Sequence, residues 1–382
     1  MSSRSKRNTR KNNRSARKNQ KSGRSFGDRL FRLLLIVCAI ALCMSYLAVF
    51  VNPSHSSLPL FFGLYYIPIL LVNILLLLIA LFRKRAYMLI PILALMPSLL
   101  FAELFVKFGK EEKELTGDPI KVVTYNVGRY LVGARGESPA ATAAHIRDFL
   151  SREKADVICL QEFSAADTSR LSSLLPDFPY RSCHFFKGNK YFGNITLSRF
   201  PIADQGKIGF SHSTNLCIWS DIKIGPKMVR VYNCHLESYA ISFTAMIKKL
   251  KGNFTDEFVE VHDRMRGTNI RRSAQVSTLL EHISGSNLPV IICGDFNDTP
   301  MSYTYHKLSQ GRKDCFVEGG SGLSGTYSVL WPMLRIDYVL IPGQYDASDH
   351  TISRIPYSDH YPVSTLIYFP DSSEQCNKGV RL

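Results

Sequence analysis

Polar residues with catalytic potential occur where apolar, strand-like runs end. In "PVIICGDFNDTP", Pro289 to Pro300, a buried-strand pattern runs directly into Asp295, Asn297 and Asp298. Carboxylates and amides are costly to hold at the end of an apolar strand unless each has a partner. An extended backbone places Asp295 and Asn297 on one side and Phe296 on the other. The segment therefore predicts that the two polar residues face a bound group while Phe296 packs inward.

The same pattern recurs in five other segments, which carry Asn126, Gln161 with Glu162, His235, Asp337, and Asp359 with His360. A lone Asp or His at a strand end is more often structural than catalytic, but six such segments indicate one shared site. Carboxylates, amides and imidazoles without cysteine suit a hard, oxygen-liganded cation such as Mg²⁺ better than zinc. A cation, a base for water and donors for developing charge are what phosphate-ester hydrolysis requires.

An α/β domain over residues 120–370 is predicted to position these side chains. Its apolar strand-like runs are "IKVVTY", "ADVICL", "YFGNITLS", "KMVRVYNCHL", "LPVIIC", "RIDYVLI" and "PVSTLIYF". Helical patterns lie between several of them, notably "AATAAHIRDFLSRE" and "IRRSAQVSTLLEHIS". Tyr239 to Arg266 is predicted to be an extra helical insertion. Residues 107–119 are a short charged linker, and residues 371–382 form a polar tail.

Residues 31–106 are predicted to be a transmembrane region. Leu33 to Phe82 contains no Asp, Glu, Lys or Arg, which is long enough for two spans of about 20 residues each. We place these spans at about 33–51 and 60–82, with a turn at Asn52 to Pro59. A third span at 86–106 is the weakest, because it contains two prolines and an acid. A signal peptide is the alternative for the first span, but its apolar stretch is too long and no small-residue cleavage site follows.

Basic charge is concentrated at the N-terminal end. The formal charge is +16 for the whole chain, yet residues 111–382 hold nearly equal numbers of basic and acidic residues. Net charge therefore gives no support for a nucleic-acid groove. Residues 1–30 are predicted to be a disordered, basic, cytoplasmic tail that can also attract anionic lipids. Basic flanks at the tail and at Arg83 to Arg85 predict an in–out–in order, so a spanning third segment places the large domain outside the cytoplasm. If that segment does not span, the domain is cytoplasmic.

The motifs "YNV", "LQE", "HLES", "GDFND", "IDYVL" and "SDHYP" occur in the order found in the endonuclease/exonuclease/phosphatase (DNase I-like) superfamily, which the chain resembles over about residues 120–370. DNase I-like nucleases, neutral sphingomyelinases and inositol polyphosphate phosphatases are among its members. The resemblance implies a four-layer sandwich of two β-sheets flanked by helices, here preceded by two or three transmembrane helices. It places the active site at one end of the sheets.

The resemblance also implies a role for each matching residue on the metal side. Glu162 corresponds to the principal Mg²⁺ ligand, Asn126 lies close to it, and Asp359 supports the metal side. Mn²⁺ is an alternative cation. Some nuclease members carry an acid two residues after the first asparagine. Gly128 stands at that position here, which argues against a second metal site.

On the phosphate side, the resemblance implies that Asp295 and Asn297 position the attacking water and the phosphate. His360 corresponds to a histidine on the scissile phosphate, oriented by Asp337. His235 corresponds to a second histidine that donates to the phosphate or to the leaving group. The sequence leaves open whether Asp295 or His360 is the base.

Together these observations predict a membrane-anchored, Mg²⁺-dependent phosphoesterase that hydrolyses a phosphodiester or phosphomonoester by metal-assisted attack of water. The predicted partners are the lipid bilayer and a phosphate-ester substrate, either a lipid head group, a phosphorylated glycan or a nucleic acid. A membrane-tethered endonuclease acting on DNA or RNA is an alternative. A catalytically silent membrane scaffold on the same fold is another, which the presence of every expected acid and histidine disfavours.

Overall fold

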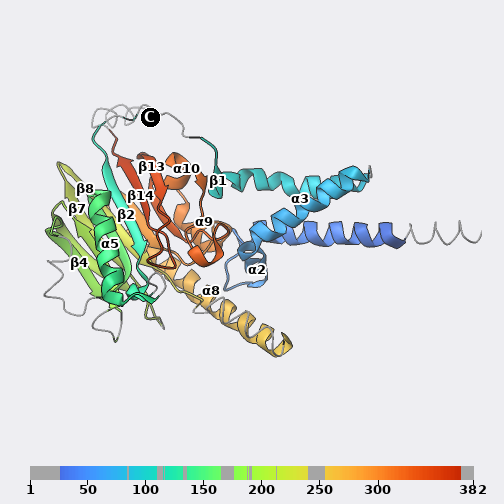
Figure 1. The fold of residues 1–382 in the computed structure, drawn as a ribbon, viewed down its shortest axis with the longest axis horizontal. Helices are drawn as coiled ribbons and strands as arrows, with labels where there is room; N and C mark the ends of the chain where they lie inside the picture. Colours follow the sequence, from blue (N-terminus) through green and yellow to red (C-terminus); the bar gives the residue numbers. More distant parts are fainter. Residues whose placement is uncertain are drawn as a thin grey trace, which may run out of the picture.

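The computed structural model of the chain describes residues 26–83, 86–109, 115, 117–131, 136–164, 176–186, 188, 192–211, 213–239 and 254–370. Two six-stranded β-sheets form its centre (Figure 1). In order across the first sheet, the strands are β13 (Asp346–Ile352), β14 (Val363–Tyr368), β2 (Ile120–Asn126), β3 (Val157–Ser164), β5 (Phe192–Ser198) and β4 (Tyr180–Phe185). Across the second they are β10 (Arg312–Asp314), β12 (Asp337–Pro342), β9 (Val290–Asp295), β8 (Lys227–His235), β7 (Leu216–Ile224) and β6 (Ile202–Gly209).

The two sheets pack face to face through one apolar core. Val122 and Val157 of the first sheet share this core with Val231, Ile291 and Val339 of the second. Every residue of β9 and β12 is buried, which explains why these strands are continuous apolar runs in the sequence. All seven strand-like runs singled out in the sequence form strands: β2, β3, β5, β8, β9, β12 and β14.

Helices cover the outer faces of both sheets and complete four layers. Helix α5 (Pro139–Glu153) lies on the first sheet, and Ser138 caps it by accepting a hydrogen bond from the Ala141 amide (3.3 Å). Helices α8 (Phe254–Ser284) and α9 (Tyr303–Ser309) cover the second sheet, near the short helix α10 (Cys315–Gly319). The predicted four-layer sandwich is therefore confirmed. Residues 254–266 of the predicted insertion form the start of α8, whereas residues 240–253 lie outside the described residues.

Apolar helices from residues 26–104 extend from one side of the sandwich, to its right in Figure 1. Two are long and apolar enough to cross a membrane: Phe26–Leu47, with a mean hydropathy of 2.4, and Ala86–Leu104, with 1.8. The second comprises η1 (Ala86–Met88), α4 (Leu89–Leu95) and η2 (Met96–Leu104). Between them, α2 (Leu58–Leu64) and α3 (Tyr66–Phe82) pass the same test only together and are bent by 73°. The segment ranked weakest from the sequence is thus unbroken, and the second segment is the bent one.

Contacts between these helices fix their directions. At one end, Arg83 lies over the ring of Phe31. Midway, the Asn73 Nδ2 donates to the Cys38 carbonyl (3.0 Å), and at the other end the Ser45 Oγ donates to the Phe62 carbonyl (2.9 Å). The first helix therefore runs antiparallel to α3. The end that carries Arg83 points away from the sandwich (Figure 1).

The helices also pack against the sandwich. Met301, which follows the GDFND segment, is buried in one cluster with Leu42 and Tyr46 of the first helix. Strand β1 (Val106–Lys107) pairs with β11 (Gly322–Leu323), so the predicted linker begins as a strand. At the ends of the chain, the first helix starts at Phe26, inside the predicted tail of residues 1–30. Residues 1–25 and the polar tail 371–382 lie outside the described residues.

Candidate active site

Strand register brings three of the expected residues side by side in the second sheet. Strand β8 runs parallel to β9 with His235 opposite Asp295. Strand β12 runs antiparallel to β9 with Asp337 opposite Asp295. Residues opposite each other on neighbouring strands place their side chains on the same face. His235, Asp295 and Asp337 therefore form a row at one end of the sheet.

The first sheet contributes residues to the same end. Strands β2 and β3 run parallel, with Asn126 opposite Gln161 and next to Glu162. The segment that enters β14 carries Ser358, whose Oγ donates to the Asn126 carbonyl (2.7 Å). That bond holds His360, two residues later, beside the other strand ends. Segments far apart in the sequence thus meet at one edge of the sandwich.

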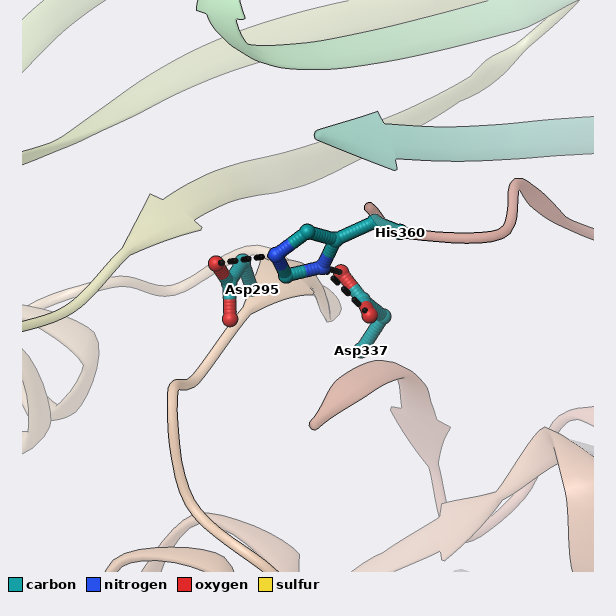
Figure 2. Close-up of side chains that lie close together, drawn as sticks. All are labelled: Asp295, Asp337 and His360. Atoms are coloured by element: carbon teal, nitrogen blue, oxygen red, sulfur yellow. Dashed lines mark hydrogen bonds and ion pairs between the residues drawn. The ribbon is translucent and has the colours of Figure 1, made fainter. Parts of the chain in front are cut away.

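His360 lies between two carboxylates, as Figure 2 shows. Its Nδ1 is 3.1 and 3.0 Å from the two Asp337 oxygens, and its Nε2 is 3.7 Å from the Asp295 Oδ2. One ligand atom from each of these three residues lies within 4.8 Å of the others, close enough to hold a metal ion. Both Asp337 oxygens already face the imidazole, however, so Asp337 acts as the orienting partner of His360.

Asp295 is held in place by two amide side chains. Its Oδ2 accepts from the Asn126 Nδ2 (2.9 Å) and from the Asn297 Nδ2 (3.0 Å), and its Oδ1 accepts from the Asn297 backbone amide (2.8 Å). Asn297 has a positive φ of 54°, which turns the chain back toward Asp295. Asp295 is 1 % exposed, so these bonds are essential to keep a carboxylate at that depth.

Glu162 reaches the site through a β-bulge. The pairing of β3 with β5 shifts register between Leu160 and Phe163, and Glu162 within the shift has a φ of 50°. Bulges of this kind redirect a side chain and are common beside active sites. The Glu162 carboxylate accepts from the Arg129 Nε (3.1 Å) and lies 3.7 Å from the His235 Nε2.

His235 is buried without a hydrogen bond. It is 5 % exposed, and neither ring nitrogen has a hydrogen-bond partner among the described residues. Its Nε2 lies 3.7 Å from Glu162 and 3.8 Å from Asp295. A buried imidazole without a partner is unfavourable, so its position between two carboxylates indicates that a bound group completes it.

The local charges set the protonation of the three central groups. Burial would lower the pKa of His360, but Asp337 and Asp295 raise it to about 10, so the imidazole is protonated at neutral pH. Burial, reinforced by Asp337, raises the pKa of Asp295 despite the two histidines. Burial would also raise the pKa of Glu162, yet His235, Arg129 and His360 together lower it. Of the two site carboxylates whose pKa is shifted, Glu162 is therefore the more strongly ionised.

This set of donors fits a divalent cation with oxygen ligands. Glu162 is ionised and partly exposed, so its carboxylate can offer an oxygen to a cation. Asp359 borders the same cavity, and its carboxylate accepts a long hydrogen bond from the Ser358 Oγ (3.3 Å). The Asn126 Oδ1 accepts a hydrogen bond from the Gly128 amide (3.0 Å), and its Nδ2 faces the carboxylates of Asp295 and Glu162.

A cavity of about 320 Å³ adjoins these residues. Glu162, Asp295, Asn297, Asp359 and His360 all line it. The volume lies at the lower end of the roughly 300–1,000 Å³ of ordinary ligand sites. All eight residues expected from the sequence therefore lie at one end of the sandwich, five of them on the cavity itself.

Some supporting residues were not found from the sequence. Arg129, in the turn η3 (Gly128–Tyr130), pairs with Glu162. Arg272 on α8 is fully buried and pairs with Asp298 (3.0 Å), so Asp298 anchors the GDFND segment and does not face the cation side. Only the positive charge of these arginines is visible in the sequence, and their pairing depends on the folded chain.

Comparison with known proteins identifies the large domain. A model described as "Endonuclease/Exonuclease/phosphatase family" matches residues 123–360, more than half of the chain. The chain belongs to the endonuclease/exonuclease/phosphatase family. Family membership and the acid–histidine site make it a hydrolase acting on phosphate esters, as the sequence predicted. A second model, a domain of unknown function (DUF8431), matches residues 28–103, the helical segment before this domain. No curated protein matches the chain.

Several solved structures are similar to this chain. An endonuclease/exonuclease/phosphatase from Beutenbergia cavernae has 16% identity and a TM-score of 0.51, covering 67% of this chain and 73% of its own. The catalytic domain of human Nocturnin, with a bound sulfate anion, has 16% identity and a TM-score of 0.50, covering 67% and 96%. The Bacteroides thetaiotaomicron mannosyl-6-phosphatase has 18% identity and a TM-score of 0.46, covering 65% and 100%. At these identities the likeness concerns the fold and not the substrate.

Proposed function

We propose that this family member is a membrane-anchored, Mg²⁺-dependent phosphoesterase that hydrolyses a phosphodiester or phosphomonoester by attack of water. The observation that carries the proposal is the set of side chains gathered around the Asp295 carboxylate. Both asparagines bond to its carboxylate, and both histidines lie within 3.8 Å of it. Glu162 lies beside the same point, 3.7 Å from His235. A structural role alone does not require two histidines and two carboxylates to converge on a cavity.

On the cation side, Glu162 and Asp359 would hold Mg²⁺, with Mn²⁺ as a substitute, and Asn126 would lie beside it. Bound Mg²⁺ would stabilise negative charge on the phosphate and lower the pKa of its water. Asn126 keeps Asp295 and Glu162 apart by donating toward both, at 2.9 and 3.5 Å. Arg129 fixes the second oxygen of Glu162, so the carboxylate is presented in one orientation.

On the phosphate side, the two candidates for the base differ in charge. The raised pKa of His360 keeps its imidazole protonated, which suits a donor to a phosphate oxygen and not a base. The raised pKa of Asp295 makes its carboxylate a better proton acceptor than an exposed one. We therefore assign the base to Asp295, with Asn297 orienting the attacking water. His235, whose ring nitrogens have no hydrogen-bond partner in the described part of the chain, donates to the phosphate or the leaving group.

The directions of the apolar helices support anchoring in a membrane and a catalytic domain outside the cytoplasm. The first helix, α3 and Ala86–Leu104 run alternately toward and away from the sandwich, and the Arg83 end lies away from it (Figure 1). Basic flanks stay in the cytoplasm, so the catalytic domain is placed on the extracytoplasmic side with the N-terminal tail cytoplasmic. Alkaline phosphatase fused after Leu382, which is active only outside the cytoplasm, tests this orientation. An inactive fusion beside an active cytoplasmic reporter would reverse it.

Hydrolysis of bis(4-nitrophenyl) phosphate and 4-nitrophenyl phosphate by the purified full chain tests the proposed activity. Wild-type protein is expected to release nitrophenol with Mg²⁺ and not with EDTA. Glu162→Gln is expected to lose more than the roughly 10–100-fold typical of a residue that only supports a metal ligand. The control Glu281→Gln changes an exposed glutamate on α8 and is expected to retain activity. Full activity of Glu162→Gln would refute the site.

The same preparation decides between the alternatives. An endonuclease would cleave DNA or RNA at the same Mg²⁺ concentration faster than small or lipid phosphodiesters. A catalytically silent scaffold would turn over none of them while keeping its wild-type melting temperature.

A further inference from the structure

The cavity beside the active site has a second, apolar side. We define this apolar wall by Leu64, Ile67, Pro68, Met265, Leu330 and Met333. Three of these residues belong to the bent second membrane segment, one to α8, and two to the stretch that enters β12. Among the described residues that line the cavity, none is Lys or Arg. The cavity thus joins an acid–histidine end to an apolar end without the cations that a polyanion requires.

The bend that forms part of this wall has a cause in the sequence. Pro68 has no amide hydrogen, so it cannot donate to the Leu64 carbonyl one turn earlier. The helical bonds continue on either side, from the Tyr65 amide to Phe61 and from the Ile69 amide to Tyr65, both at 3.1 Å. An interrupted backbone in an apolar segment is tolerated where it is buried in protein or lines a cavity. The bend lies at such a cavity.

The bent segment is held firmly against the catalytic loop. A side chain at Gly63 would lie 2.3 Å from the Met301 carbonyl oxygen and 2.6 Å from the Ala48 Cβ, so α2 contacts the loop that follows GDFND through bare backbone. The rings of Phe61 on α2 and His262 on α8 stack at 4.4 Å. The wall is therefore a fixed part of the site and cannot swing away without breaking this packing.

An exposed tyrosine at the cavity indicates where the surface of a membrane would lie relative to the site. Tyr65, which is 43 % exposed, lies at the bend and lines the cavity, next to the buried Tyr66. Tyrosines concentrate at membrane–water boundaries. Because Tyr65 lies at the bend, the active-site end of the cavity faces the head-group side and the apolar wall continues into the membrane segment.

We propose that the substrate is an amphiphilic phosphate ester of the surrounding bilayer, whose phosphate meets Asp295 and His360 while its apolar chain lies against the apolar wall. This inference rests on the proposed phosphoesterase function and specifies its substrate class. A water-soluble sugar phosphate or nucleotide would leave the apolar wall in contact with water. An alkyl chain would remove that surface from water and gain affinity in proportion to the area buried.

A series of 4-nitrophenyl alkyl phosphates, with methyl, butyl and octyl chains, tests this proposal on the full chain in nanodiscs. In each, water bonds to phosphorus as the bond to nitrophenolate breaks, giving an alkyl phosphate and nitrophenol, so only the chain differs. We expect kcat/KM to rise with chain length by up to about fourfold for each methylene buried against the wall. Equal kcat/KM for all three chains would overturn the proposal.

Paired variants locate the effect. Leu330→Gln is expected to abolish the rise with chain length, so that the octyl ester loses its advantage over the methyl ester measured with the same variant. Val329→Gln changes the adjacent residue, which is 49 % exposed and does not line the cavity, and is expected to keep the full rise. Met333→Gln replaces Leu330→Gln if the melting temperature shows that the latter is unfolded. An unchanged rise in both wall variants would overturn the proposal.

Binding without turnover separates this inference from the proposed function. Octylphosphonate is expected to bind wild-type protein more tightly than methylphosphonate by calorimetry, and Leu330→Gln is expected to remove the difference. If the methyl ester is not hydrolysed with Mg²⁺, the proposed function fails, whatever the two phosphonates do. If it is hydrolysed and the two phosphonates bind equally, only the substrate class is wrong.

Discussion

Asp295 is the residue on which the geometry of the site depends. It occupies the last position of β9, opposite His235 on one side and Asp337 on the other, and accepts three hydrogen bonds from Asn126 and Asn297. Residue types and order were enough to predict this convergence, because each residue ends or adjoins a strand. The partner of each group was not predictable, since it depends on register and on the turn conformation at Asn297.

The His360–Asp337 pair is expected to make stability depend on pH. The folded-state pKa of His360, about 10, lies above its ordinary value of 6.5, so protonated His360 stabilises the folded state. That contribution is complete below pH 6.5 and disappears as pH rises through about 10. With EDTA present, the melting temperature of wild-type protein is expected to exceed that of Asp337→Asn by a margin that shrinks over this range.

The variant His55→Asn provides the control for this comparison, because it removes an exposed imidazole that is not a contact of the pair. Its melting temperature is expected to follow that of wild type at every pH. A constant gap between wild type and Asp337→Asn from pH 6.5 to 10 would show that His360 is not held protonated.

Asp298→Ala tests the anchoring of the GDFND segment by a buried ion pair. The change leaves Arg272, which is fully buried, without its carboxylate. Breaking such a pair costs about 3–5 kcal/mol, because the remaining charge stays desolvated. We expect a clear fall in melting temperature in detergent. The control Asp263→Ala, at an exposed position on α8, the helix that carries Arg272, is expected to change the melting temperature little. Equal melting temperatures of the two variants would mean that Asp298 does not anchor the segment.

At the scale of elements, central strands were predictable and several peripheral ones were not. The seven runs found in the sequence lie mostly inside the sheets, where burial on both faces gives continuous apolar stretches. Edge strand β6, "IADQGKIG", is largely exposed and carries Asp204, Gln205 and Lys207, so no apolar pattern marks it. Strand β7 lies inside the second sheet but was also missed, because Ser220, Asp221 and Lys223 interrupt its apolar residues.

Gly294 is the position where an element and the site depend on one residue. Its φ of +127° suits glycine, and a Cβ there would lie 2.1 Å from the Cys234 carbonyl oxygen of β8. Gly294→Ala is expected to destabilise the protein by about 3 kcal/mol or more and to separate His235 from Asp295. Melting temperature and nitrophenol release report both effects. Gly209→Ala, where a Cβ meets no atom within 4 Å, is the matched control. Wild-type behaviour of Gly294→Ala would contradict the described register.

For the whole molecule, the apolar N-terminal helices and the sandwich act as one packed unit. The sequence showed both parts and the boundary between them, because charge and hydropathy change sharply near residue 107. It did not show that the second apolar segment bends at Tyr65 and lines the active-site cavity, since that contact joins residues more than 200 positions apart. The relation between anchor and site is therefore a property of the tertiary structure.

Gly63→Val tests this coupling. A larger residue cannot fit between the Met301 carbonyl and Ala48, so α2 or the catalytic loop must move. We expect lower turnover of a small aryl phosphodiester, even though Gly63 is not among the residues that line the cavity. Gly27→Val, near the start of the first helix with no atom within 4 Å of an added Cβ, is expected to retain wild-type turnover. Equal rates for the two variants would show that the helices serve only as an anchor.

A Mg²⁺ titration of phosphodiester hydrolysis by EDTA-stripped full chain tests the central claim most directly, because it separates cation binding from phosphate chemistry. Mg²⁺ is expected to restore activity to wild-type protein. Glu162→Gln is expected to raise the Mg²⁺ concentration needed for half-maximal rate, while His360→Asn is expected to lower the maximal rate at a similar Mg²⁺ requirement. Hydrolysis that persists in EDTA, or identical titrations of wild type and Glu162→Gln, would contradict a single cation site formed by these strand ends.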